Sequence, residues 1–158
     1  MESQRLFCAT SHSPTERSSG PMPSMKTRPK IGTTGELNFT VEQKHVIDFA
    51  TEGMPAVLST PNLIGWLERT AREMVSPLLE PDERTVGVEI EIRHLAPTPL
   101  GAGVTCLARV IATDGATITF HLEARDEQEL LVRGLHKRAV IRVEPFARRV
   151  ARKLKSRT

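Results

Sequence analysis

The chain has 158 residues, of which 39% are apolar and 26% charged, and its 22 basic side chains slightly outnumber its 19 acidic ones. This is the length and balance of one globular domain, and no apolar run approaches the roughly 20 residues that cross a bilayer. The chain has no Tyr and one Trp, too few aromatic residues for a base-stacking surface. Two cysteines, Cys8 and Cys106, are too few for a disulfide framework or a zinc cluster. We therefore expect a cytoplasmic protein with no membrane insertion, no nucleic-acid partner and no metal.

Charge is unevenly distributed along the chain. Residues 31–144 carry 11 basic and 17 acidic side chains, whereas residues 145–158 carry six basic ones and no acid. Such a basic end can contact nucleic acid, an anionic membrane or a phosphorylated ligand, or it can be a solvated helix end that aids solubility. Residues 1–30 are rich in Ser, Thr, Pro and Arg, which is typical of disorder. We expect a disordered extension at 1–33, one domain at 34–144 and a basic tail or short helix at 145–158.

Two elements are predicted in the first half of the domain. From residue 35, apolar and polar residues alternate, which predicts a short strand, and residues 44–50 favour a helical turn or lid. A long helix is predicted from Ser59 or Thr60, both good N-cap residues, to Pro77. Its apolar residues recur at helical spacing: Leu63, Ile64, Leu67, Ala71, Met74 and Val75.

The second half changes to a period of two, which predicts four antiparallel strands joined by tight turns. They fall at residues 86–92, 104–112, 117–125 and 130–143, followed by a short basic helix at 146–154. In the first of them we expect a buried face formed by Val86, Val88, Ile90 and Ile92. A strand, a long helix and then four strands predict an α+β fold, in which a curved antiparallel sheet wraps around one central helix. This arrangement fits the hotdog fold.

Two polar residues of the predicted helix occupy places suited to catalysis. Glu68 lies beside apolar positions, where a carboxylate can serve as a nucleophile or general base, or can pair with Arg72 as an ordinary surface residue. Thr60 lies at the helix N-terminus, where the helix dipole and unpaired N–H groups can stabilise an oxyanion, or it can be a plain cap.

The spacing of Thr60 and Glu68 predicts an assembly. Eight residues on one helix correspond to about 12 Å of rise, so the two side chains are too far apart to act on one carbonyl from one chain. Two helices running antiparallel across a two-fold axis would bring Glu68 of one chain to Thr60 of the other. We therefore expect a homodimer with two composite sites, and a dimer of dimers is left open.

Two histidines fall on predicted strands. His94 lies next to a Pro-rich turn and suits proton transfer near neutral pH, although a lone histidine at a sheet edge is often structural. His136, in the last strand, is interpreted as a structural hydrogen-bonding group. The sequence has no P-loop, G-x-G-x-x-G, H-E-x-x-H or G-x-S-x-G motif, which argues against nucleotide hydrolysis, dinucleotide redox chemistry and zinc catalysis.

Several short stretches follow one another in a distinctive order. They are Pro55-x-Val57 with Ser59-Thr60, Gly65-x-Leu67-Glu68, Leu79-Glu80-Pro81, Gly87, His94, Ala96-x-Thr98-Pro99-x-Gly101 and Gly134-x-His136-x-Arg138-Ala139-Val140-Ile141. Over roughly residues 37–153 the chain thereby resembles the hotdog-fold acyl-CoA thioesterases of the fluoroacetyl-CoA thioesterase type. The resemblance implies a catalytic set that falls on Thr60, Glu68 and His94.

The resemblance also implies substrate-binding residues. The family's strand glycine near the site falls on Gly87. Because Pro61 has no N–H, the oxyanion donor would be the N–H of Thr60 or Asn62, or the Thr60 hydroxyl. Arg138 or the basic tail could hold the phosphates of CoA.

The expected function is hydrolysis of an acyl-CoA with a short or small acyl group to the carboxylate and CoA, with the CoA thioester as substrate and no cofactor. The family's specialised member closes its site with a lid that contains phenylalanines, whereas here the segment reads Thr51-Glu52-Gly53-Met54, so selection for a fluoroacetyl group is not expected. Two alternatives remain: a non-catalytic acyl-CoA-binding hotdog module, and a hotdog enoyl-thioester hydratase. The hydratases usually pair an Asp with a His in a loop–helix element, and no such pair lies near Thr60.

Overall fold

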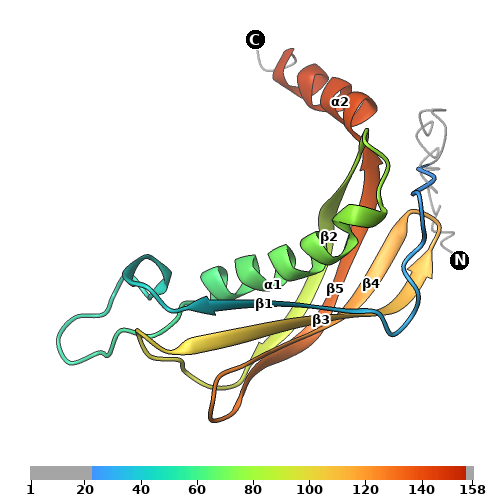
Figure 1. The fold of residues 1–158 in the computed structure, drawn as a ribbon. Helices are drawn as coiled ribbons and strands as arrows, with labels where there is room; N and C mark the ends of the chain where they lie inside the picture. Colours follow the sequence, from blue (N-terminus) through green and yellow to red (C-terminus); the bar gives the residue numbers. More distant parts are fainter. Residues whose placement is uncertain (1–22, 156–158) are drawn as a thin grey trace, which may run out of the picture.

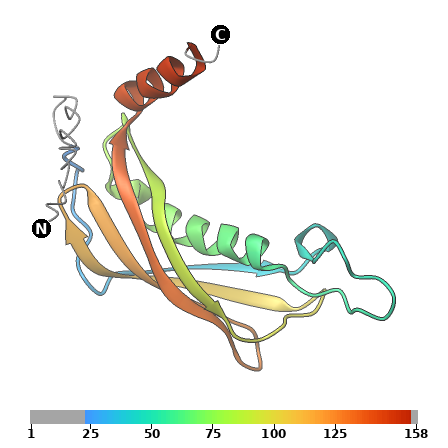
Figure 2. The ribbon, with the colours of Figure 1, turned by 180° about the vertical axis from the view of Figure 1, so that it is seen from behind.

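The computed structural model describes residues 23–155. One antiparallel sheet curves around helix α1 (Thr60–Val75), which lies on its concave face (Figures 1 and 2). The five strands are β1 (Thr34–Thr40), β2 (Glu83–His94), β3 (Gly103–Asp114), β4 (Thr117–Arg125) and β5 (Leu130–Arg142). Their order across the sheet is β1-β3-β4-β5-β2, which leaves β1 and β2 at the edges. The predicted curved sheet around one long helix is confirmed.

Helix α1 is held by its apolar face and by its N-cap. Leu63, Leu67, Ala71 and Val75, each four residues apart, are fully buried against the sheet. The N-cap residue is Ser59, whose side chain accepts the N–H of Asn62, and Thr60 is the first helical residue. Of the two predicted caps, Ser59 is confirmed and Thr60 is not, so the Thr60 hydroxyl is available for another partner.

A β-bulge in β2 changes which residues face the helix. The pairing of β2 with β5 slips between Gly87 and Glu89, so the face that points to α1 moves by one residue at Val88. Before the bulge the buried residue is Thr85, whereas Val86 is only half-buried and Val88 is 58% exposed. The predicted buried face is wrong for Val86 and Val88, because the alternation of apolar and polar residues does not reveal where a bulge adds an extra residue to the strand.

Residues 24–33 lie against the sheet. The carboxylate of Glu83, which is fully buried, accepts the N–H groups of Ser24 at 2.8 Å and Met25 at 3.4 Å. Burial opposes its ionisation, but three backbone N–H groups and a nearby arginine outweigh burial and hold the pKa of Glu83 below its usual value. The expectation of disorder over 1–33 is thus wrong for 24–33, while residues 1–22, with Cys8, lie outside the described residues.

Short helices and a terminal helix complete the fold. The predicted helical turn at 44–50 is reduced to the 3₁₀ turn η1 (Gln43–His45), and a second turn, η2 (Ser76–Leu78), follows α1. Helix α2 (Val143–Lys155) is longer than predicted, buries no residue and projects away from the sheet (Figure 1). Within residues 23–155, no helix is both long enough and apolar enough to cross a membrane.

Candidate active site

Glu68 points from α1 toward β5. Its Oε1 lies 3.4 Å from Nη1 of Arg138 and 3.5 Å from Nε2 of His136, and 40% of its side chain is exposed. The ion pairs of Glu68 are with these two residues and not with Arg72, the surface alternative; Arg72 lies 4.0 Å from Glu73. The structure therefore gives Glu68 a fixed orientation between helix and sheet while leaving the carboxylate accessible.

Gly87 makes room for this carboxylate. A Cβ atom at position 87 would lie 2.2 Å from Oε1 of Glu68 and 3.2 Å from Cε1 of His136, and any side chain here would displace Glu68. The glycine belongs to the site for a steric reason, which the sequence pattern did not give.

Arg138 and His136 form the floor beneath Glu68. Arg138 donates from Nε to Thr85 Oγ1 at 3.0 Å and from Nη2 to the Thr85 carbonyl at 2.9 Å, and its side chain is 6% exposed. Burial lowers the pKa of Arg138, and the charge of Glu68 partly offsets this effect. The donors of Arg138 are directed inward to Thr85, Glu68 and His136, which gives no support to the expectation that Arg138 holds a CoA phosphate.

His136 is held as a neutral ring. Its Nδ1 donates to the carbonyl of Glu89 at 2.8 Å, which leaves Nε2 to accept from Nη1 of Arg138 at 3.1 Å. Burial is the main cause that lowers the pKa of His136. The assignment of His136 as a structural group missed its contact with Glu68. The signal available was the i, i+2 spacing with Arg138, which places both side chains on one face of β5.

Thr60 and His94 form a second cluster at the N-terminus of α1. Thr60 Oγ1 and His94 Nδ1 are 2.9 Å apart and share a hydrogen bond. Burial lowers the pKa of His94, partly offset by the backbone of Ala96, so the ring is neutral near pH 7. Its Nε2 is buried with no hydrogen-bond partner among the described residues. This cluster can hold a developing oxyanion and deliver a proton.

Asn62 does not join that cluster. Its N–H and its side-chain amide both bond to Ser59 Oγ, at 3.4 and 2.8 Å. The Asn62 N–H thus serves the helix cap, which gives no support to the expectation that it is an oxyanion donor. The donors that remain are the N–H of Thr60, which as the first helical residue has no partner within the helix, and the Thr60 hydroxyl.

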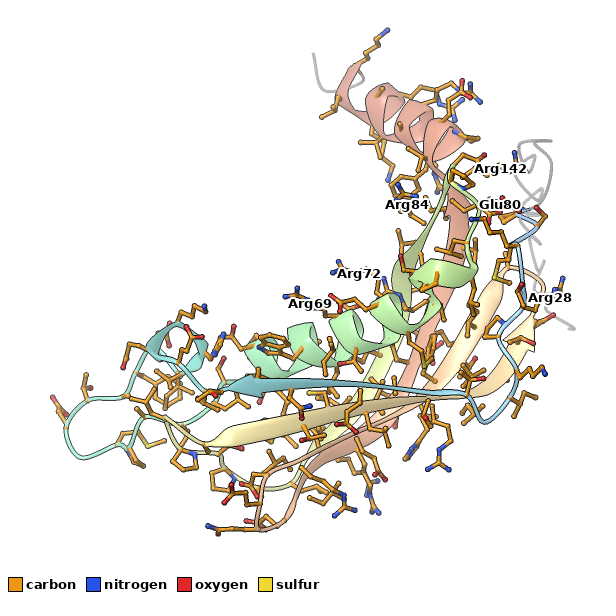
Figure 3. All side chains as sticks on the ribbon, viewed as in Figure 1. Arg28, Arg69, Arg72, Glu80, Arg84 and Arg142 are labelled. Carbon is orange, nitrogen blue, oxygen red and sulfur yellow. The ribbon has the colours of Figure 1, made fainter. Side chains whose placement is uncertain are left out.

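The two clusters lie apart along α1, one at its N-terminus and the other at its middle. The first cluster contains Thr60 and His94, and the second contains Glu68, Gly87, His136 and Arg138. About 12 Å of helix rise separates Thr60 from Glu68. Arg69 and Arg72 project from the open side of α1 (Figure 3). One chain thus carries both halves of the predicted catalytic set without bringing them together.

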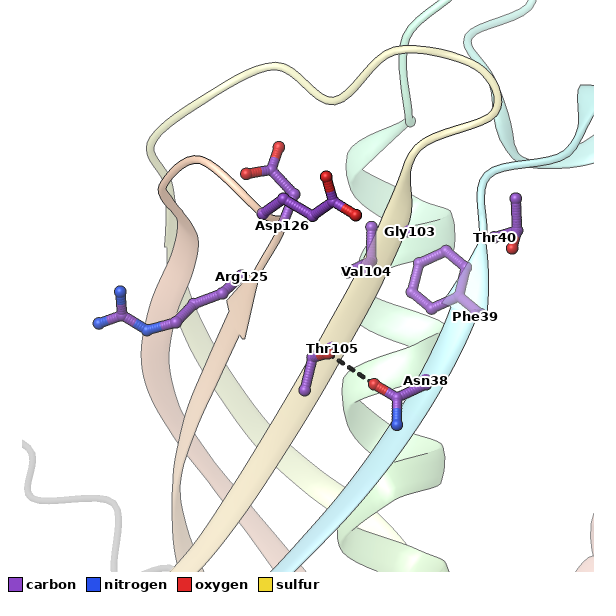
Figure 4. Close-up of a pocket in the computed structure, with 9 residues that line it drawn as sticks. Asn38, Phe39, Thr40, Gly103, Val104, Thr105, Arg125 and Asp126 are labelled. Atoms are coloured by element: carbon purple, nitrogen blue, oxygen red, sulfur yellow. Dashed lines mark hydrogen bonds between the residues drawn. The ribbon is translucent and has the colours of Figure 1, made fainter.

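Other reactive groups offer less. Burial raises the pKa of the Cys106 thiol to about 12, so the thiolate that a nucleophile requires is absent. Among residues 23–155, no cluster of His, Cys, Asp or Glu could hold a metal ion. A hollow of about 450 Å³ lies where β1, β3 and the β4–β5 turn meet (Figure 4). It is lined by residues such as Asn38 and Thr105, which bond to each other, and by none of the predicted site residues.

Known proteins resemble this chain in sequence and fold. Residues 41–144 match the model of the family described as fluoroacetyl-CoA-specific thioesterase. The chain is 33% identical over 99 residues to the fluoroacetyl-CoA thioesterase of Streptantibioticus cattleyicolor. This alignment covers 63% of this chain and 71% of that protein.

Solved structures agree. A crystal structure of a single-residue variant of the fluoroacetyl-CoA-specific thioesterase superposes with a TM-score of 0.75 at 28% identity, covering 81% of this chain and 99% of that one. The same variant in complex with fluoroacetate and CoA superposes with a TM-score of 0.70 at 28% identity, covering 75% of this chain and 99% of that one. A thioesterase-superfamily protein of Thermus thermophilus superposes with a TM-score of 0.73 at 26% identity, covering 83% of this chain and 97% of that one.

The curved sheet, the central helix and these likenesses define a hotdog-fold thioesterase, as the sequence predicted. Within that class, the chain belongs to the fluoroacetyl-CoA-specific thioesterase family. Its activity is hydrolysis of an acyl-CoA thioester.

The two neutral histidines predict how stability depends on pH. Because the pKa values of His94 and His136 are lowered in the folded chain, the unfolded chain binds protons first as the pH falls. The contribution of the two histidines to the free energy of unfolding is fully present above the pKa of an unfolded histidine, about 6.5. It is lost as the pH falls toward their lower pKa values in the folded chain. We expect the free energy of unfolding, measured with urea, to be lower at pH 5.5 than at pH 7.5.

A matched pair of variants assigns this effect. His136→Gln should reduce the difference between the two pH values, whereas His121→Gln, on β4, should leave it unchanged. The carboxylate of Glu83, with its pKa below the usual range, loses its contribution only at lower pH. An equal difference in both variants would contradict the role given to His136.

Proposed function

We propose that the thioester is cleaved at a site composed of two chains, with Glu68 from one and Thr60 with His94 from the other. Glu68 acts as the nucleophile or as the base that activates water. Thr60 and the N-terminus of its helix polarise the thioester carbonyl, and His94 assists protonation of the departing thiolate. The observation that carries this proposal is that the Glu68 carboxylate is oriented by Arg138 and His136 and remains 40% exposed.

The open edge of the sheet supports a homodimer. Strand β2 is long, lies at the edge and has unpaired backbone groups on its outer side. If β2 pairs antiparallel with its copy about an axis at Glu91, Ile90 meets the partner's Ile92 on the inner face. Glu89 then meets the partner's Arg93 on the outer face, which is a favourable pair of opposite charges.

The same register assembles the proposed site. Counting outward from Glu91, the bulge at Val88 brings Gly87 opposite the partner's His94. Since Gly87 touches Glu68 and His94 bonds Thr60, the two clusters would meet across the strand pair. In this proposal the bulge is what allows residues of opposite parity, 87 and 94, to face the same side.

Cross-linking tests the register. In a Cys8→Ser background, Glu91→Cys should form a disulfide between chains under mild oxidation, because residues facing each other at the axis lie about 5 Å apart between Cα atoms. Glu89→Cys is the matched control, because it would lie four residues from its own copy, about 13 Å away. Cross-linking of the control with none at position 91 would contradict this register.

The acyl group is proposed to be small and not selected for fluorine. Phe120 is fully buried in the core, and Trp66 stacks on Phe39 with ring centroids 4.4 Å apart. In the loop before α1, Met54 and Phe49 are 44% and 61% exposed, so neither of these two side chains is packed down over the site. We expect kcat/KM for acetyl-CoA and fluoroacetyl-CoA to agree within about tenfold.

Release of free thiol from a panel of short, medium and aryl acyl-CoAs tests the function. Hydrolysis of at least one of them, lost in Glu68→Gln, would support the proposal. Water addition to an enoyl-CoA without thiol release would favour a hydratase, and binding without either reaction would favour a non-catalytic module. A cytoplasmic homodimer that uses no cofactor, with CoA as part of its substrate, completes the proposal.

A further inference from the structure

Helix α2 is amphipathic and covers almost nothing. Its apolar residues recur every three or four positions and form one stripe, and each is 41% to 63% exposed: Val143, Phe146, Val150 and Leu154. At the root of the helix, the Val143 N–H donates to the carbonyl of Asp82 at 2.9 Å. An exposed apolar stripe on a projecting helix indicates a surface that meets something else.

The other faces of α2 are basic. They include Arg148, Arg149 and Arg152, against a single acid, Glu144, which pairs with Arg148. At the root of the helix the charges are mixed: Figure 3 shows Arg84 and Arg142 near Glu80, and Arg142 pairs with Asp82 at 3.3 Å. By contrast, residues 31–144 have a net charge of −6, so the basic helix projects from an acidic body (Figure 1).

We propose that α2 binds the surface of an anionic phospholipid membrane. The helix lies parallel to the membrane, with the stripe of Val143, Phe146, Val150 and Leu154 at the boundary between headgroups and acyl chains. Its arginines pair with the lipid phosphates. A short helix with one apolar face, a basic opposite face and low overall hydrophobicity is the type that lies in this interface. The contact is peripheral and requires no spanning helix.

Charge and apolarity together favour lipid over the two other occupants. Nucleic acid would use the cations but would leave the apolar stripe in water. A second α2 would cover the stripe but would bring two strongly basic helices together, which repel each other. Of these three occupants, only an anionic lipid surface satisfies both faces of the helix at once.

Flotation of the full chain with vesicles tests this proposal. We expect binding to phosphatidylcholine vesicles with about one third phosphatidylglycerol, and at least tenfold weaker binding to pure phosphatidylcholine. Raising the salt from about 0.1 M to about 1 M shortens the Debye length from roughly 10 to 3 Å and should release the protein.

Two variants separate the two faces of α2. Phe146→Ser with Leu154→Ser keeps the charge and should weaken binding at least tenfold. Arg148→Gln with Arg149→Gln and Arg152→Gln should weaken it about 100-fold, from about 1 kcal/mol for each arginine. The matched controls lie on other exposed surfaces: Ile31→Ser with Leu135→Ser, and Arg109→Gln with Arg125→Gln and Arg133→Gln. These controls should bind as the unaltered chain does, and the Phe146→Ser, Leu154→Ser variant should keep thiol release without vesicles.

Three results would overturn the proposal. One is binding that does not distinguish anionic from neutral vesicles. Another is a loss of dimer mass in the Phe146→Ser, Leu154→Ser variant without a change in vesicle binding, which would assign the stripe to a second copy. The third is salt-sensitive retention of duplex DNA by a chain that leaves vesicles unbound, which would assign α2 to nucleic acid.

Discussion

Glu68→Gln should lower kcat/KM for thiol release by about 10²- to 10⁴-fold, the range for loss of a general base. The amide is the same size but can neither attack the thioester nor take a proton from water. Arg138 keeps its bonds to Thr85, so the fold should survive. Steady-state kinetics with the best acyl-CoA of the panel, together with a thermal melt, measure both quantities.

Glu73→Gln is the matched control for this substitution. Glu73 lies on the same helix, carries the same charge and bonds Arg69 at 2.7 Å on the exposed surface. Its loss should leave kcat/KM unchanged, because an exposed pair of this kind contributes little. Equal losses in both variants, or activity above about a tenth in Glu68→Gln, would remove Glu68 from the reaction.

Gly87→Ala should lower kcat/KM by about 100-fold or more, because an error of about 1 Å in a catalytic group has effects of this size. The added methyl group would lie 2.2 Å from Oε1 of Glu68, so the carboxylate must leave its place beside Arg138. The flexible Glu68 side chain can move without unfolding the strand. We expect a folded protein with normal secondary structure by circular dichroism and a large loss of activity.

Gly103→Ala controls for the general cost of replacing a strand glycine. A Cβ atom at position 103, the first residue of β3, meets no atom within 4 Å. Kinetics of this variant should match those of the unaltered chain. If Gly87→Ala were equally active, the placement of Glu68 would not depend on the gap at position 87.

The local patterns of the sequence predicted the elements well. The four-residue recurrence from Leu63 to Val75 predicted α1, and the alternation over 117–125 predicted the limits of β4. These patterns depend on neighbours along the chain, which the sequence contains in full.

Choices set by tertiary structure could not be predicted in this way. Both Ser59 and Thr60 have hydroxyls that can cap a helix, and the Ser59 N–H is fixed by the carbonyl of His45. The bulge at Val88 depends on pairing with β5. Arg138 and Glu68 are 70 residues apart, and only the folded sheet shows that the arginine supports the carboxylate rather than a phosphate.

Mixing two inactive variants tests the composite site most directly. Glu68→Gln chains and Thr60→Val chains are unfolded together, refolded at equal concentration and assayed for thiol release. A site shared between chains gives one intact site in every hybrid dimer, so activity should return to roughly a quarter of that of the unaltered protein. If each site lies within a single chain, every site in the hybrid is damaged, and activity no higher than that of the separate variants would contradict the shared site.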